Sequence, residues 1–143
     1  MRQIKFRAWV EKQKYMAYQG TPDLETIQSF MFHYGDQILM QYTGIKDNEE
    51  NEIYEGDIVD VYGTRYVVKF GKVIREVVLQ NNNATCMLEL NTFYFEWVCN
   101  GKAYFSVVNN HKGEHDLKGT KIVGNIFENE NLLKELNLNR QTT

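Results

Sequence analysis

The stretch DIVDVYGTRYVVKFGKVIREVVLQ, residues 57–80, decides the fold class. Most of its apolar side chains are β-branched or aromatic, and such side chains favour strands. Residues 62–65 and 70–72 each place a glycine between two apolar runs, which is typical of tight turns. We therefore predict three antiparallel strands at 57–62, 65–70 and 73–80, the outline of a small SH3-like β roll.

Runs of the same kind occur on both sides of this stretch, so we expect a mainly β protein. The Asn-Gly pair at residues 100–101 is the strongest short hairpin signal in the chain, and the asparagines at 81–83 predict a loop. The fold class is an SH3-like β roll or barrel with additional hairpins. Its further strands are expected at 2–10, 15–18, 38–43, 86–90, 92–99, 103–109 and 121–127.

Two short helices complete the prediction. An N-terminal helix is expected to begin at Thr21, which offers a capping oxygen, with Pro22 in its first turn. Its buried stripe would consist of Leu24, Ile27, Phe30 and Met31. A C-terminal helix is expected over residues 130–137, capped by Asn129.

Length and composition favour one globular domain. The chain has 143 residues, of which 43% are hydrophobic and 24% charged. We expect a single domain over 1–143, with a division into 1–36 and 37–137 as the alternative. The net charge of −3 argues against a basic nucleic-acid or membrane-surface protein. Because the first residues lack the apolar core of a signal peptide, we expect a cytoplasmic protein that does not contact a membrane.

Few residues offer redox or metal chemistry. Cys86 and Cys99 are the only thiols and lie in apolar surroundings, which predicts two buried reduced cysteines, with a redox pair as the alternative. Residues 111–115 match the H-x-x-E-H pattern of zinc peptidases, but they include a glycine and lie between two strands rather than on a long helix. We expect a solvated loop there, with no cofactor and no metal. An enzyme that uses His111, Glu114 and His115 is a minority hypothesis.

Acidic side chains gather around residue 50. We interpret this segment as a solvated hairpin tip, and as its alternative an acidic contact surface for a basic partner. The candidate contact residues are Lys46, Asp47, Glu49, Glu50 and Glu52. The spacing lacks the glycine that an EF-hand calcium loop requires.

Aromatic residues make up 13% of the chain, and some stand beside basic residues. In a small β barrel such aromatic side chains mostly fill the core. The alternative is a groove that stacks the bases of single-stranded nucleic acid. The candidate groove residues are Lys5, Arg7, Trp9, Arg65, Tyr66 and Lys69.

Four segments resemble the YopX-like phage and prophage proteins: residues 4–9 (IKFRAW), 39–47 (LMQYTGIKD), 52–59 (EIYEGDIV) and 122–129 (IVGNIFEN). The resemblance implies an SH3-like β roll, a phage or prophage origin and a tendency to self-associate, and no established activity. At 48–51 the family's Asn-Gly turn is replaced by Asn-Glu-Glu-Asn, which predicts a looser or longer hairpin tip.

The residues of these segments also suit structural positions in a β roll. Gly44 and Gly56 suit positions of positive φ or close approach, and Tyr42 is expected to pack against Tyr54 across the hairpin. The residues that suit a barrel core are Ile53, Ile58, Val59 and Val61.

The leading hypothesis is a non-enzymatic, homo-oligomeric β-roll module that binds a host or phage protein. Its basis is a strand-rich, aromatic-rich chain without a catalytic constellation, whose strand edges need covering. The alternative is a small barrel that binds single-stranded nucleic acid.

Overall fold

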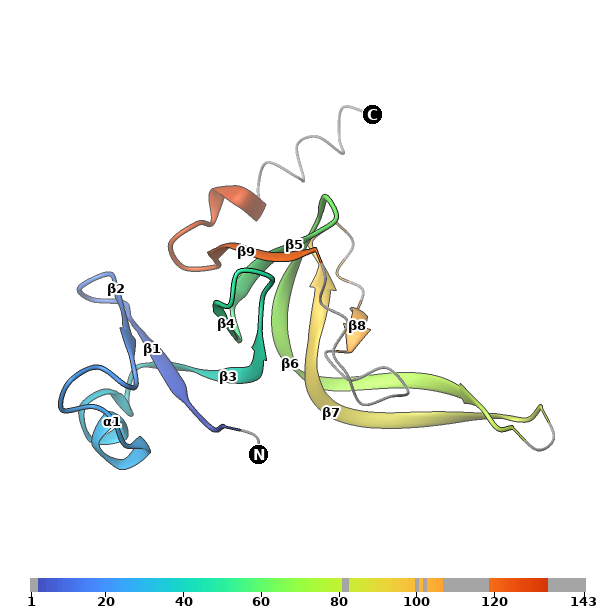
Figure 1. Cartoon of the computed structure of the whole chain (residues 1–143), viewed down its shortest axis with the longest axis horizontal. Coiled ribbons are helices and arrows are strands. Elements are labelled where there is room, and N and C mark those ends of the chain that lie inside the picture. The colour runs from blue at the N-terminus through green and yellow to red at the C-terminus, as the bar shows by residue number, and fades with distance from the viewer. Residues whose placement is uncertain (1–2, 81–82, 100, 102, 107–118, 134–143) are drawn as a thin grey trace.

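The protein is mainly β, as predicted, and its strands form two antiparallel sheets (Figure 1). The computed structural model describes residues 3–80, 83–99, 101, 103–106 and 119–133. In chain order its elements are β1 (Phe6–Val10), β2 (Tyr15–Tyr18), α1 (Ile27–Tyr34), β3 (Ile38–Lys46), β4 (Glu52–Tyr54), β5 (Asp57–Val61), β6 (Thr64–Val78), β7 (Thr85–Trp97), β8 (Ala103–Ser106) and β9 (Thr120–Asn125).

The first sheet has the strand order β2-β1-β3-β4. The first half of β3 pairs with β1 and its second half with β4, and the register shifts between Tyr42 and Lys46. Gly44, with φ of 91°, lies at this irregularity and meets the expectation of a positive φ. Helix α1 packs on this sheet through Phe30, which shares a small buried cluster with Ala8 and Ala17.

The second sheet has the strand order β8-β7-β6-β5-β9 and curls into a half-barrel (Figure 1). Its core includes Val59 and Phe95, together with Ile45 and Ile53 from the β3–β4 hairpin of the first sheet. The hairpin therefore helps to close the core of the half-barrel. The predicted core residues are confirmed: Ile53, Ile58 and Val59 are fully buried, and Val61 packs against them.

Strands β6 and β7 form one long hairpin, so the predicted turn at residues 70–72 is wrong. The two strands pair continuously from Tyr66 opposite Trp97 to Val78 opposite Thr85, and Gly71 lies opposite Thr92 within the ladder. The expected strands at 65–70 and 73–80 are one strand, and those at 86–90 and 92–99 are another. Pairing along the whole ladder outweighs the local preference of one glycine for a turn.

Two connections were predicted in this region. Of the asparagines at 81–83, the first two lie outside the described residues, and Asn83, just before β7, has φ of 55°, as expected of a loop residue. Pairing of Phe95 with Phe105 confirms the hairpin predicted at residues 100–101.

The N-terminal helix begins later than predicted. Thr26, not Thr21, is the N-cap, and its hydroxyl oxygen accepts a hydrogen bond from the Ser29 N–H at 3.0 Å. Asp23 has φ of 70°, which belongs to a turn and prevents a helix from starting at Pro22. Phe30 is buried as expected, whereas Ile27 is largely exposed. The C-terminal helix is described only over residues 131–133, and the rest of the predicted 130–137 helix lies outside the described residues.

Both cysteines are free, but neither is buried as predicted. Cys86 is exposed because it lies in the distal part of the β6–β7 hairpin, which projects from the half-barrel (Figure 1). Cys99 is half-buried directly after β7. Apolar sequence neighbours do not bury a residue when its strand extends away from the core.

Two alanine substitutions test the placement of the glycines. At Gly71 a Cβ atom would lie 3.6 Å from the Tyr94 ring, an ordinary contact, so Gly71→Ala is expected to raise the free energy of unfolding by up to about 1 kcal/mol. At Gly56, with φ of 91°, a Cβ atom would lie 3.0 Å from the Met40 Sδ, and Gly56→Ala is expected to lower it by roughly 1–3 kcal/mol. Urea unfolding measures both. Equal destabilisation by the two changes would contradict the continuous β6 strand.

Candidate functional site

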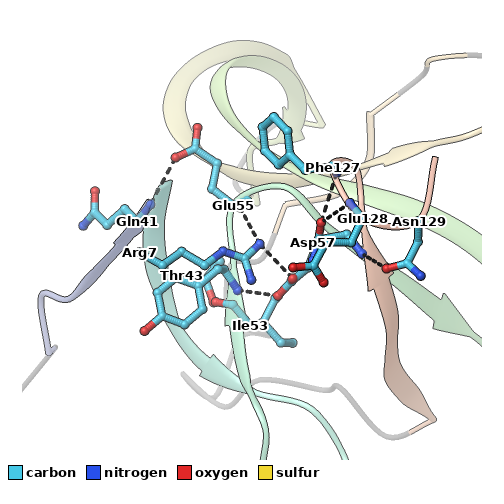
Figure 2. A network of polar contacts seen from close by, with 11 residues as sticks. Arg7, Gln41, Thr43, Ile53, Glu55, Asp57, Phe127, Glu128 and Asn129 are labelled. Carbon is cyan, nitrogen blue, oxygen red and sulfur yellow. Dashed lines mark hydrogen bonds and ion pairs between the residues drawn. The ribbon is translucent and has the colours of Figure 1, made fainter. Parts of the chain in front are cut away.

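A buried ion pair joins the two sheets. Arg7 of β1 is 2% exposed, and its Nη2 lies 2.9 Å from Oδ1 of Asp57 at the start of β5 (Figure 2). The same Nη2 donates a hydrogen bond to the Glu55 carbonyl at 3.1 Å. Arg7, a candidate residue of an exposed nucleic-acid groove, is therefore enclosed instead, because both faces of β1 are covered.

The turn between β4 and β5 holds Asp57 in place. The Tyr54 N–H donates to Oδ2 of Asp57 at 2.7 Å, and the Arg7 guanidinium lies 4.9 Å from the centroid of the Tyr54 ring. The positive φ of Gly56 forms the turn, as predicted for that residue. Tyr42 packs on Tyr54 with ring centroids 5.5 Å apart, which confirms the predicted cross-strand pair.

Burial dominates the electrostatics of this pair. It raises the pKa of Asp57 to about 6, although the Arg7 guanidinium and the Tyr54 N–H both favour the carboxylate. At neutral pH Asp57 is ionised and pairs with Arg7. Nε of Arg7 is buried without a hydrogen-bond partner among the described residues. Because both side chains are enclosed, the pair is a structural element and does not offer a reactive group to a substrate.

The turn after β9 contacts the same region. Asn125 accepts hydrogen bonds from the N–H groups of Phe127 and Glu128 at 3.0 and 2.9 Å, and Asn129 accepts one from the Asn125 N–H at 3.1 Å (Figure 2). The Phe127 ring stacks on Trp9 of β1 with centroids 5.4 Å apart. All four segments that resemble the YopX-like proteins therefore meet around the Arg7–Asp57 pair.

Asp47, a predicted partner contact, is instead a buried structural acid. Burial alone would raise its pKa, but hydrogen bonds from the N–H groups of Ile122, Asn51 and Glu49 outweigh burial and hold the pKa below its ordinary value. Asp47 thereby closes the tip of the β3–β4 hairpin and attaches it to β9. The tip is a connection of several residues in which Glu50 has φ of 66°, in line with the looser turn predicted there.

The other acidic candidates lie near basic side chains. Glu52 pairs with Lys5 at 2.8 Å, Glu49 with Lys121 at 3.4 Å, and Glu50 with Lys46 at 4.0 Å. These partly exposed pairs spread positive charge through the acidic segment. The exposed residues of the tip are Lys46, Glu49 and Glu50, and Glu52 is half-buried.

The six candidate nucleic-acid residues do not form one exposed surface. Arg7, Trp9 and Tyr66 are buried. Lys5 is paired with Glu52, and Lys69 pairs with Glu96 at 3.0 Å. The Arg65 guanidinium lies 3.5 Å from the Leu132 carbonyl. Alternation along a strand indicates which side chains share a face, but it does not show which face the second sheet covers.

Several exposed apolar side chains lie along the distal half of the β6–β7 hairpin, residues 70–78 and 85–93, which we call the ribbon. It projects from the half-barrel as a two-stranded extension (Figure 1). Ile74 is 62% exposed, Val78 61% and Met87 64%. Phe70 and Leu88 are also exposed. This surface was not predicted from the sequence, because Gly71 favoured a turn. The feature that indicates it is an apolar stretch without a proline to end the strand.

Among the described residues, no group of three or more His, Cys, Asp or Glu side chains is placed to hold a metal ion. The H-x-x-E-H segment at 111–115 lies outside the described residues. No helix in the described part of the chain is long and apolar enough to span a membrane.

The raised pKa of Asp57 predicts a pH-dependent stability. The pKa is about 6 in the folded protein and about 3.9 in an unfolded chain, so the folded state binds the extra proton between these values. The stabilisation is fully present below pH 4 and is lost as the pH rises through 6. The advantage of the wild type over Asp57→Asn in free energy of unfolding is expected to be about 2 kcal/mol larger at pH 4 than at pH 7.

Urea unfolding of both proteins from pH 4 to 7 measures this difference. Asp36→Asn, which removes an exposed carboxylate, is the control, and its difference from the wild type is expected to stay nearly constant. An Asp57→Asn difference that grows with pH would show that Arg7, not burial, determines the pKa of Asp57.

A crystal structure of protein EF1440 from Enterococcus faecalis is similar over 93% of this chain and 99% of that chain, with 21% sequence identity and a TM-score of 0.45. No curated protein matches the chain. The model of the YopX protein family matches residues 23–134, which is most of the chain and includes three of the four segments that meet around Asp57. The chain therefore belongs to the YopX family.

Proposed function

We propose that the protein is a non-enzymatic interaction module that assembles with copies of itself through the ribbon. The single observation that carries this proposal is the exposure of apolar side chains along the ribbon, where Ile74, Val78 and Met87 are each more than half exposed. An exposed apolar surface of this kind is typical of a contact site.

The physics of a lone hairpin supports the same proposal. A two-stranded ribbon without a third strand or a covering layer is marginally stable in water. Beyond Val68, no strand among the described residues pairs with the β6 edge of the ribbon, so this edge presents N–H and C=O groups to other chains. Contact with a further copy supplies the covering layer and satisfies these groups.

Light scattering coupled to size-exclusion chromatography tests the assembly. At tens of micromolar the wild type is expected to elute as an oligomer, whereas Ile74→Asn with Met87→Gln is expected to shift toward the monomer, because both changes remove apolar area from the ribbon. The melting temperature of the monomeric core is expected to change little, since both positions are exposed.

The matched control is Phe32→Ser. Phe32 on α1 is 85% exposed, so the change removes a comparable apolar surface from another part of the molecule. It is expected to leave the oligomer intact. A monomeric wild type, or an oligomer lost equally in Phe32→Ser, would contradict assembly through the ribbon.

We also propose that the assembled module binds a host or phage protein in the host cytoplasm. The support is that Phe32 and Tyr62, both largely exposed, belong to surfaces distinct from the ribbon. A pull-down from host lysate, with and without nuclease, tests this. A stoichiometric protein that survives nuclease and is lost in Phe32→Ser is the expected result; recovery of nucleic acid alone would contradict it.

A further inference from the structure

The outer edge of β6 is open along the ribbon. On one side β6 pairs with β7 over its whole length, and on the other it pairs with β5 only from Thr64 to Val67. The last backbone contact on that side is the hydrogen bond from the Gly56 N–H to the Val68 carbonyl at 2.8 Å. Beyond Val68, no strand in the described part of the chain pairs with this edge.

One lysine and one glutamate of β6 lie symmetrically about Ile74. Lys72 precedes Ile74 by two positions and Glu76 follows it by two, so all three side chains share one face of the ribbon. Phe70 and Val78, four positions away on either side, share that face as well. A strand that runs antiparallel to a copy of itself about Ile74 therefore places opposite charges and apolar side chains against each other.

The edge of β7 lacks this property. Between Thr85 and Trp97 its only charged residues are Glu89 and Glu96. Because both charges are negative, no register of two antiparallel β7 edges places opposite charges against each other, and pairing about Glu89 would bring two carboxylates directly opposite, which is destabilising. Of the two ribbon edges, the β6 edge is the self-complementary one.

We propose that two copies of the chain pair antiparallel through their β6 edges about a twofold axis at Ile74. This pairing rests on the proposed self-assembly and specifies the contact between the two copies. In it Ile74 lies opposite the partner's Ile74, Lys72 opposite the partner's Glu76, and Phe70 opposite the partner's Val78. The two ribbons become one continuous four-stranded sheet. Because the contact uses the same patch on both copies, the pairing closes on itself and does not propagate into a fibre.

The contact covers exposed apolar side chains and brings a second carboxylate to Lys72. Phe70, Ile74 and Val78, exposed in the single chain, each gain an apolar neighbour across the new edge. Lys72 already forms an ion pair with Glu89 of β7 and would lie between that carboxylate and the partner's Glu76. Each dimer contains this arrangement twice.

Cysteine trapping tests the register. In a Cys86→Ser, Cys99→Ser background, Ile74→Cys places two thiols directly opposite each other, with Cβ atoms about 5 Å apart. Mild oxidation is expected to convert most of this variant into a covalent dimer. Val78→Cys is the matched control, because Val78 is equally exposed on the same face but lies about 26 Å from its own copy in this register. It is expected to remain uncrosslinked.

Charge exchange provides a second, independent test. Glu76→Lys brings lysines together twice per dimer and is expected to weaken dimerisation roughly tenfold. Adding Lys72→Glu to the same chain restores opposite charges across the contact and is expected to recover most of the lost affinity, the remainder being lost with the Lys72–Glu89 ion pair. Analytical ultracentrifugation measures the dissociation constants.

The outcomes distinguish the register from the assembly itself. If the wild type is an oligomer but Ile74→Cys and Val78→Cys crosslink equally, or the double exchange fails to rescue, the β6 pairing is overturned while the proposed self-assembly stands. If the wild type is a monomer, both are overturned. Selective trapping at position 74 together with rescue by the double exchange supports both.

Discussion

The ion pair between Arg7 and Asp57 is the interaction on which the rest of the structure depends. It joins β1 of the first sheet to β5 of the second inside a region closed to water. Moving either charge alone into such a region is unfavourable, and removal of one partner from a buried pair typically costs about 3–5 kcal/mol. The two sheets therefore adopt the arrangement in which both charges are satisfied together, and this arrangement determines how the half-barrel meets the N-terminal strands.

The neighbouring turns hold Asp57 and the β3–β4 hairpin in position around this ion pair. Gly56 forms the turn that places Asp57 against the Tyr54 N–H, while Asp47 attaches the tip of the β3–β4 hairpin to β9. At Gly124 a Cβ atom would lie 2.6 Å from the Asn129 side chain, so only glycine fits beneath that turn. Segments far apart in sequence are thus constrained by one another, which explains why the family resemblance gathers at a site without reactive groups.

The ribbon differs from this region because many of its side chains are exposed rather than buried. Apart from the buried Phe93, its residues contribute little to the core of the half-barrel, and several of its apolar side chains are exposed to water in the single chain. The half-barrel does not need the ribbon for its core, because the core cluster consists of residues outside the ribbon. The chain thereby separates the part that maintains the fold from the part that is available for contact.

The sequence by itself determined the features that depend on near neighbours. These are the mainly β class, the hairpin at residues 100–101, the tyrosine pair of the β3–β4 hairpin and the core position of Ile53. Alternation and turn chemistry act over a few residues, so they are visible in a single chain.

Only the tertiary structure decided where those elements are covered and where they continue. The buried contact of Arg7 lies 48 positions away in the sequence, and the strand that keeps Gly71 extended belongs to the far side of a loop. The first helix likewise starts at Thr26 because of the turn that precedes it, not because of the first available cap. Burial of a charge and extension of a strand through a glycine are set by distant partners, and a local pattern carries no information about those partners.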